Sequence, residues 1–336
     1  MSRNTTMPIA SRRTFAKLGS AVLAAAVSAS ARGAMPPGLP ALPASGQPLA
    51  ETRYRTIDVG GLEIFYREGG PAAAPVVLML HGFPTSSRMF RNLIPMLADK
   101  YRVIAPDYPA FGHSAVPSRA DFSYTHAHLS EVVEALIDQL GVTRFGMYVM
   151  DFGGPIGYRL MLKYPGRVMG IVIQNTPAFG EPIDGPLWAA ELAYWKDGSP
   201  AHRDAVRFKL TPDAVRNQYV AGTREPSLID PDNWTIDSAL LARPGVDEIM
   251  LDLLYDIRNN RKTVADARQF FKAHQRQVMI ATGANDPLFP GDSMKPPADM
   301  PDIAFHPIDG GHFALEDHCA EIGRLTRDFL ARVMPA

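Results

Sequence analysis

The sequence predicts an α/β fold in which a mostly parallel sheet is flanked by helices and carries an inserted helical segment. Two observations lead to this prediction. Short apolar runs, typical of strands buried on both faces, alternate with helical patterns along most of the 336 residues. The alternation stops between residues 177 and 273, where helical patterns continue without a convincing buried strand, and then resumes. The length fits one large α/β domain with an insertion.

The elements follow one another in a regular order. Residues 54–68 alternate apolar and polar side chains around Gly60 and Gly61, which predicts a β-hairpin. The remaining strands are expected as short apolar runs, and the helices as stretches with apolar spacing of three and four residues. We expect strands over 76–80, 103–105, 147–150, 168–173, 278–281 and 303–305, and helices over 89–97, 129–140 and 315–333.

The segment from Gly146 to Gly157 reads GMYVMDFGGPIG and is the centre of the prediction. An apolar strand runs into Asp151, two glycines follow, and a helical pattern begins. This is the layout of a nucleophile elbow, a strained turn that lifts one side chain above the edge of the sheet. Carboxylate attack on a saturated carbon gives an alkyl ester that water can cleave, so an aspartate here favours that chemistry. Alternatively, Asp151 caps the following helix.

Two loops after late strands supply the partners that such a nucleophile needs. Asp286 follows the strand expected over 278–281, and His312 follows the last strand. Because the carboxyl ends of parallel strands meet at one edge of a sheet, both side chains are expected beside Asp151. The order nucleophile, acid, histidine is that of a hydrolase triad. Taken alone, Asp286 before Pro287 also fits a turn, and His312 also fits a helix start.

The segment HGFP at residues 81–84 fits the remaining catalytic role. A loop at this position contributes one backbone N–H to an oxyanion hole, and the residue after the nucleophile contributes the other. The predicted donors are therefore the backbone amides of Phe83 and Phe152. A cis peptide bond before Pro84 is compatible with this loop.

Together these motifs resemble the α/β-hydrolase superfamily, and more narrowly its epoxide hydrolase and haloalkane dehalogenase branch, whose members use an aspartate nucleophile. The resemblance covers residues 54–334 and rests on His-Gly-x-Pro, Asp-x-Pro-x-x-Gly-x-Ser, the aspartate elbow, Asn-Asp-Pro and Gly-His-Phe. It implies an α/β-hydrolase core over 53–176 and 274–336 and a helical cap over 177–273. It also implies that His312, held by Asp286, activates the water that cleaves the ester.

The resemblance leaves two activities open, which differ in the leaving group. Epoxide hydrolases of this branch activate the epoxide oxygen with cap tyrosines, for which Tyr255 and Tyr219 are the candidates, although both also fit as core tyrosines. Haloalkane dehalogenases typically hold the halide with side-chain N–H groups where this chain has Phe83 and Phe152, or with a cap tryptophan. A halide site would then depend on the indole groups of the insertion, Trp188, Trp195 and Trp234.

We therefore predict an epoxide hydrolase that converts a small apolar epoxide and water to a vicinal diol. Dehalogenation of a haloalkane or haloacid by the same triad is the alternative. A non-catalytic small-molecule-binding homologue is a third reading, but it predicts a damaged triad, whereas the motifs are complete. Ester hydrolysis is disfavoured because carboxylate attack on an ester would give a reactive anhydride.

The composition argues against several other classes of protein. The net charge is −1, so nothing predicts a nucleic-acid partner. The sequence contains neither a Gly-rich phosphate loop of standard spacing nor a Cys/His cluster, so we expect no nucleotide cofactor and no metal. Cys319 is the single cysteine, which excludes an internal disulfide.

The N-terminal residues are predicted to lie outside the fold. Residues 11–17 resemble a twin-arginine export signal, and the apolar run 18–27 and an Ala-Ser-Ala cleavage motif at 29–31 follow. We expect residues 1–31 to be a signal peptide for export to the periplasm and 32–52, rich in Pro, Gly and Ala, to be a linker. A basic amphipathic start of an ordinary domain is the alternative. The apolar run is too short for a stable membrane span, which needs about 20 residues.

Overall fold

The computed structural model describes residues 50–180, 183 and 185–335. The expected signal peptide and nearly all of the expected linker lie outside the described residues, so export to the periplasm stays a prediction. No helix in the described ranges is long and apolar enough to cross a membrane.

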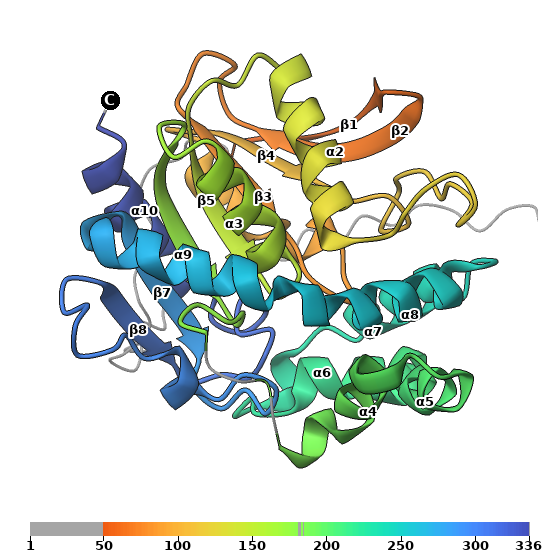
Figure 1. Ribbon diagram of the computed structural model, residues 1–336. Helices are drawn as coiled ribbons and strands as arrows, with labels where there is room; N and C mark the ends of the chain where they lie inside the picture. Colours follow the sequence, from red (N-terminus) through yellow and green to blue (C-terminus); the bar gives the residue numbers. More distant parts are fainter. Residues whose placement is uncertain (1–49, 181–182, 184, 336) are drawn as a thin grey trace, which may run out of the picture. The chain divides into compact units, whose positions relative to one another are not determined.

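The described residues build one eight-stranded sheet with the order β1-β2-β4-β3-β5-β6-β7-β8 (Figure 1). The hairpin β1–β2 is antiparallel, β2 pairs antiparallel with β4, and every other neighbouring pair is parallel. This confirms the predicted hairpin and the mostly parallel sheet. The strands are β1 (Thr52–Val59), β2 (Leu62–Gly69), β3 (Val76–Leu80), β4 (Arg102–Pro106), β5 (Phe145–Met150), β6 (Val168–Gln174), β7 (Val278–Gly283) and β8 (Ala304–Ile308).

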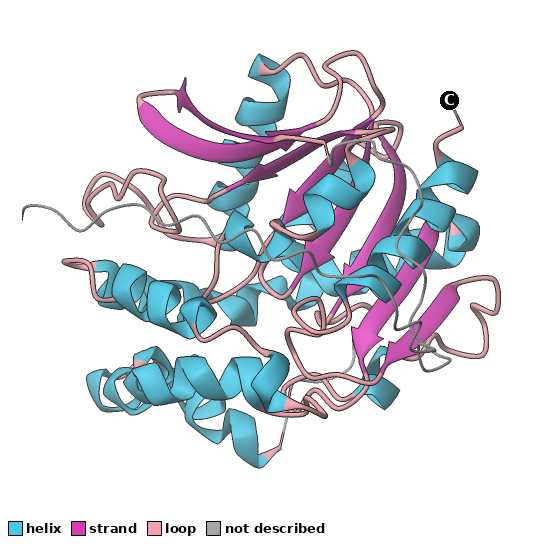
Figure 2. Ribbon diagram, turned by 180° about the vertical axis from the view of Figure 1, so that it is seen from behind, coloured by secondary structure: helices cyan, strands magenta, loops and turns pink. Residues whose placement is uncertain are grey.

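The centre of the sheet is buried and largely apolar because helices cover both faces. Every residue of β3, β5 and β7 is buried, which explains why these strands read as continuous apolar runs. The helices α2 (His126–Gln139), α3 (Gly153–Lys163) and α9 (Arg261–Ala273) pack against one another on one face (Figure 1). On the other face, α10 (Cys319–Val333) contacts β6, β7 and α1 (Leu93–Leu97) (Figure 2).

The helix expected over 89–97 is interrupted in the structure. A 3-10 turn, η1 (Ser87–Phe90), comes first, and the separate short helix α1 follows. Pro95 explains the break, because proline has no N–H to donate to the carbonyl of Arg91 and its ring clashes there in a continuous helix. A new helix tolerates the proline, since in its first turn that N–H has no partner anyway.

Most of the inserted helices lie across the carboxyl ends of the parallel strands (Figures 1 and 2). We call residues 186–256 the cap. It contains η2 (Pro186–Trp188), α4 (Ala189–Asp197), α5 (Pro200–Val206), η3 (Arg207–Leu210), α6 (Pro212–Val220), η4 (Pro226–Leu228), α7 (Asp232–Leu241) and α8 (Val246–Asp256).

The last helix of the segment expected as cap, 177–273, belongs to a different layer. Helix α9 packs against α3, and the rings of Tyr158 and Phe271 meet edge to face with centroids 5.4 Å apart. The helical region between β6 and β7 therefore contributes both a cover for the site and part of the layer that flanks the sheet.

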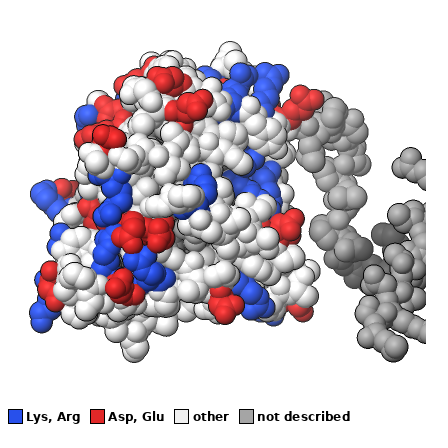
Figure 3. Space-filling view, turned by 90° about the vertical axis from the view of Figure 1, so that its right-hand side faces the viewer, with Lys and Arg blue, Asp and Glu red and all other residues white. Residues whose placement is uncertain are grey.

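Charged side chains of both signs are interspersed on the face of the described residues shown in Figure 3. That face does not present the continuous basic surface that a polyanion would need.

The junction between β5 and α3 gives a test of how tightly the sheet and helix are packed. A Cβ at Gly153 would overlap the carbonyl oxygen of Leu80, which belongs to the neighbouring strand backbone. We expect Gly153→Ala to lower the free energy of unfolding by about 1–3 kcal/mol in urea titration, the usual cost of overpacking. Gly166→Ala is the matched control, because a Cβ there meets nothing within 4 Å. Equal stabilities of the two variants would contradict this account of the junction.

Candidate active site

Asp151 stands at the turn between β5 and α3 in a strained backbone conformation. Its φ of 49° lies in the left-handed region, which costs a non-glycine residue about 1–3 kcal/mol. Thr176 supports the turn by donating its hydroxyl to the Asp151 carbonyl oxygen at 2.8 Å. The N-cap of α3 is Phe152, and no side chain caps that helix end. The geometry is therefore that of a nucleophile elbow, and the helix-cap interpretation of Asp151 is wrong.

The structure brings Asp151, Asp286 and His312 together from the ends of three strands. His312 Nδ1 lies 2.8 Å from Asp286 Oδ2, and His312 Nε2 lies 3.9 Å from Asp151 Oδ2. Asp286 and His312 are both almost completely buried. Within the described part of the chain, His312 Nε2 has no hydrogen-bond partner. This nitrogen therefore faces the Asp151 carboxylate and is free to accept a proton from a water molecule placed between them.

Asn175 holds Asp286 in place and was not identified from the sequence. Its Nδ2 donates to Asp286 Oδ2 at 2.7 Å, and its Oδ1 accepts from the backbone N–H of Gly283 at 3.0 Å. The backbone N–H of Leu288 donates to the other oxygen, Asp286 Oδ1, at 2.8 Å. The sequence did carry a signal, because Asn175 is a polar residue directly after a buried strand, as Asp151 is.

The two predicted backbone donors both reach the nucleophile. The N–H of Phe83 donates to Asp151 Oδ1 at 2.8 Å, and the N–H of Phe152 also donates to this carboxylate. The peptide bond between Phe83 and Pro84 is cis. The Phe83 amide thus holds Oδ1, while Oδ2 lies toward His312.

Burial and neighbouring charges act in opposite directions on the pKa values of Asp151 and His312. Burial raises the pKa of Asp151 above its ordinary value, although His312 and the backbone amides of Phe83 and Phe152 counteract this. Burial alone would lower the pKa of His312, but the charge and hydrogen bond of Asp286, together with Asp151, raise it overall. These carboxylates therefore stabilise the imidazolium that forms when His312 takes up a proton.

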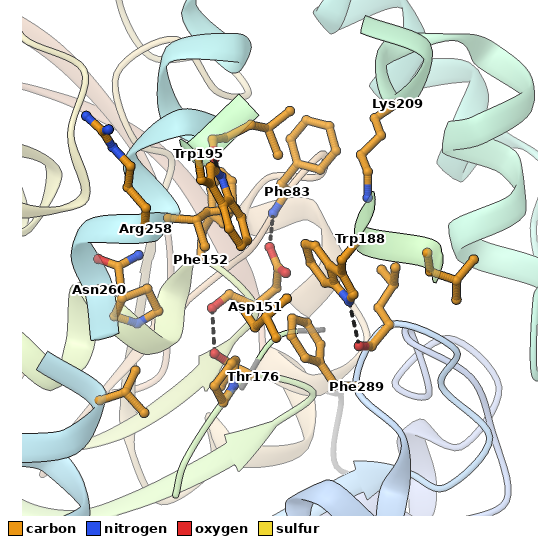
Figure 4. Close-up of a pocket in the computed structure, with 18 of the residues that line it drawn as sticks. Phe83, Asp151, Phe152, Thr176, Trp188, Trp195, Lys209, Arg258, Asn260 and Phe289 are labelled. Carbon is orange, nitrogen blue, oxygen red and sulfur yellow. Dashed lines mark hydrogen bonds between the residues drawn. The ribbon is translucent and has the colours of Figure 1, made fainter. Parts of the chain in front are cut away.

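A cavity of about 410 Å³ opens above Asp151, between the sheet and the cap (Figure 4). Its wall is largely apolar and aromatic, with Phe83, Phe152, Trp188, Trp195 and Phe289 among the lining residues. No group of three or more His, Cys, Asp or Glu side chains that could hold a metal occurs in the described ranges. The arrangement suits a small organic molecule that carries one electrophilic carbon to Asp151.

Comparison with known proteins assigns the family. A family model described as the alpha/beta hydrolase fold matches residues 75–318. The chain belongs to the α/β-hydrolase family. A Saccharomyces cerevisiae protein named as an uncharacterized hydrolase is 39% identical over 277 residues, which make up 80% of this chain and 94% of the yeast protein.

Two further relatives carry more specific names. A haloalkane dehalogenase of Bradyrhizobium diazoefficiens is 34% identical over 166 residues, 48% of this chain and 51% of that protein. The crystal structure of an epoxide hydrolase from Vigna radiata matches with a TM-score of 0.63 at 22% identity, covering 84% of this chain and 99% of the other, and shows the shared fold. The hydrolase thus lies in the branch of the superfamily that contains haloalkane dehalogenases and epoxide hydrolases.

The expectation that Tyr255 reaches the substrate is contradicted by its position on α8. Its ring packs against Tyr194 with centroids 4.5 Å apart, and its hydroxyl accepts a hydrogen bond of 2.6 Å from Arg258. Of the described residues, Leu254 and Arg258 line the cavity, whereas Tyr255 does not. Successive residues of a helix point about 100° apart, and the Tyr255 side chain faces Tyr194 instead of the cavity.

Tyr219 is also directed away from the substrate. It is buried, its ring stacks on Phe313 at 4.1 Å, and its hydroxyl donates to Asp237 Oδ2 at 2.5 Å. Its neighbours Asn217 and Gln218 belong to the described cavity lining, but Tyr219 does not. The assignment of Tyr219 as an epoxide-activating residue is therefore wrong, because a buried carboxylate already binds its hydroxyl.

The tryptophans considered for halide binding differ in position. Trp188 and Trp195 line the cavity, and Trp234 is absent from the described lining. The indole N–H of Trp195 donates to the carbonyl of Leu254 at 2.7 Å, and that of Trp188 donates to the carbonyl of Leu288 at 3.3 Å. Both indole donors are thus engaged with the backbone (Figure 4 shows the Trp188 bond).

The pKa of His312 gives a test of the site that needs no substrate. We expect ¹⁵N-histidine NMR to show His312 titrating above its ordinary pKa of about 6.5, because the charge and hydrogen bond of Asp286, together with the charge of Asp151, outweigh burial. Asp286→Asn should lower the pKa below that value, since burial then dominates. Loss of one resonance in His312→Gln assigns the signal among the nine histidines. The control is Asp309→Asn, a half-exposed carboxylate that pairs with Arg224; an unchanged His312 pKa in Asp286→Asn would refute the assigned pairing.

Proposed function

We propose that this hydrolase converts epoxides to vicinal diols in two steps, through a covalent ester on Asp151. One observation carries the proposal, which is the separation of roles between the two oxygens of Asp151. Oδ1 accepts the Phe83 N–H at 2.8 Å, and Oδ2 lies 3.9 Å from His312 Nε2 at the cavity floor. The oxygen beside the base is thus the nucleophile, and the other already occupies the oxyanion hole.

In the first step, Asp151 Oδ2 forms a bond with a ring carbon of the epoxide. The carbon–oxygen bond of the ring breaks, and the departing oxygen takes a proton. The product is an alkyl ester of Asp151. No oxyanion forms on Asp151 at this stage, so the step needs an acid for the leaving oxygen more than it needs the oxyanion hole.

In the second step, His312 Nε2 takes a proton from water, and the hydroxide attacks Asp151 Cγ. Negative charge develops on Oδ1, where the amides of Phe83 and Phe152 stabilise it; one such donor is typically worth about 3–4 kcal/mol. The bond between Cγ and the alkyl oxygen then breaks, and this oxygen recovers the proton from His312. The diol leaves, and one oxygen of Asp151 now comes from water.

The leaving group is proposed to be an epoxide oxygen because of what the cavity wall offers. A halide leaves as a stable anion and needs N–H donors, whereas an alkoxide needs a proton. Phe83 and Phe152 have no side-chain N–H, and the indole groups of Trp188 and Trp195 donate to backbone carbonyls.

Hydrolytic dehalogenation is the second candidate, and one observation favours it. The hydrogen bond from the Trp188 indole is long, at 3.3 Å, so this N–H is the group that a halide would recruit. The similarity to a haloalkane dehalogenase, at 34% identity over 166 residues, supports the same alternative.

The covalent intermediate is tested by removing the base of the second step. We expect His312→Gln to react once with an epoxide and then stop, because water is no longer activated. Intact-protein mass spectrometry should show an increase by the mass of the epoxide, and peptide mapping should place it on Asp151. The control is the double variant Asp151→Asn/His312→Gln, which should form no adduct. Absence of an adduct with an epoxide that the wild type turns over would exclude the two-step scheme.

The leaving group is tested by product analysis with styrene oxide and 1-bromobutane in parallel assays. We expect the wild type to form diol from the epoxide and to release no bromide, because the indole N–H groups of Trp188 and Trp195 already donate to backbone carbonyls. Bromide release without diol would overturn the epoxide assignment and support the dehalogenase. If bromide is released, Trp188→Phe tests whether the Trp188 indole binds the halide, because this variant removes the indole N–H and keeps an aromatic wall.

A further inference from the structure

A buried lysine enters the cavity from the cap and has no role in the scheme so far. Lys209, on η3, lines the cavity, and its side chain is only 12% exposed. Figure 4 shows it extending from the cap toward Trp188, and its Nζ lies 4.6 Å from the centre of that ring. An ammonium group removed from water to this extent is costly unless a partner compensates it.

That partner is Glu191, whose carboxylate contacts Lys209 Nζ. Glu191 is completely buried, and in the described part of the chain neither of its oxygens has any other hydrogen-bond or ion-pair partner. Trp188, Glu191 and Trp195 are spaced by three and four residues, which places them on one side of the helix turn. Both tryptophans and Lys209 line the cavity, and the buried Glu191 contacts Lys209 from behind this lining.

Lys209 also interacts electrostatically with the catalytic groups. Burial lowers its pKa to about 8, and the negative charge of Asp151 partly opposes this. The positive charge of Lys209 in turn lowers the pKa of His312. Lys209 thus lines the same cavity as Asp151 and is coupled through its charge to both Asp151 and His312.

We propose that Lys209 is the general acid that protonates the epoxide oxygen and that Glu191 positions its ammonium group. The inference rests on the epoxide hydrolase function proposed above. As Asp151 Oδ2 bonds to the ring carbon, the electron pair of the broken carbon–oxygen bond goes to oxygen, which takes a proton from Lys209 Nζ. After ester hydrolysis Asp151 carries one proton from water, and loss of this proton to solvent balances reprotonation of Lys209 from solvent.

The other polar groups of the lining are less suited to this role. Asn217, Gln218 and Asn260 donate hydrogen bonds but have no acidic proton to transfer. Arg258 holds its proton too tightly, and it is engaged with Tyr255. An ammonium group whose pKa lies near the working pH combines a high protonated fraction with ready proton release. Lys209 thus provides the proton donor that Tyr219 and Tyr255, which do not belong to the described lining, cannot provide.

The test isolates the first step by measuring adduct formation in the His312→Gln background with styrene oxide. We expect Lys209→Met to slow alkylation of Asp151 by at least about 100-fold, the lower end of the usual general-acid contribution. Lys209→Arg should be slowed almost as much, because it keeps the charge but does not release the proton. Lys262→Met, on an exposed lysine of α9, is the control and should react at the parental rate. Parental rates in Lys209→Met or in Lys209→Arg would overturn the acid role.

A pH profile separates proton transfer from a merely structural effect. The groups that act on Lys209 are Glu191, Asp151 and His312, and His312 is absent from the test background. Alkylation should slow above a pH of about 8, as Lys209 loses its proton. Glu191→Gln should move this alkaline limb to lower pH, because the neighbouring anion is lost. An unchanged limb in Glu191→Gln would refute the positioning role.

The two proposals fail in different ways. If no epoxide gives an adduct in His312→Gln or diol in the wild type, the epoxide hydrolase function fails. If the wild type forms diol and Lys209→Met still alkylates normally, only the acid assignment fails. Lys209→Met leaves the Glu191 carboxylate buried without its partner, which destabilises the fold. The double variant Lys209→Met/Glu191→Gln removes both charges and is therefore the control for an effect of stability on the alkylation rate. Circular dichroism of each variant confirms the fold before the rates are compared.

Discussion

The close approach of the β5–α3 turn to the neighbouring strand is the constraint on which the site depends. Asp151 adopts a positive φ, and glycines surround it because side chains there would collide with their neighbours. A Cβ at Gly82 would overlap the Asp151 side chain, one at Gly153 the Leu80 carbonyl, and one at Gly154 the Thr176 side chain. This packing brings the amides of Phe83 and Phe152 to the Asp151 carboxylate. The strain at Asp151 is thus balanced by backbone contacts that also build the oxyanion hole.

The charged groups Asp151, Asp286, Lys209 and Glu191 each lie near a group of opposite charge or near His312. Asp286 is held by Asn175 and by His312, and His312 lies between two carboxylates. Across the cavity, Lys209 is paired with Glu191 and also acts on Asp151. Buried charges are costly when they are isolated. The placement of opposite charges near one another therefore allows Asp151, His312 and the Lys209 ammonium group to share one largely apolar cavity. The same apolar wall excludes water and strengthens each of these interactions.

The sequence was a good predictor wherever the backbone alone decides the outcome. The sheet, the elbow at Asp151 and the meeting of Asp286 and His312 follow from strand patterns and from the geometry of parallel sheets. Predictions that needed side-chain direction on a cap helix failed. Tyr255 and Tyr219 lie on the expected helices but one residue away from lining positions, and a shift of one residue turns a helical side chain by about 100°. No local pattern fixes that rotation, because it depends on how the cap packs on the core.

Lys209 and Glu191 show why the remaining part of the site required the structure. One is in a 3-10 turn and the other in a helix that starts nearly twenty residues earlier, and in the sequence each looks like an ordinary surface charge. Their burial becomes visible only when the cap is folded over Asp151. The core therefore positions Asp151, Asp286 and His312 through backbone geometry, whereas the wall opposite them is built from side chains of the cap. In the proposed reaction the core makes the bond to carbon, and the cap wall, through the Lys209 ammonium group, determines which leaving group is accepted.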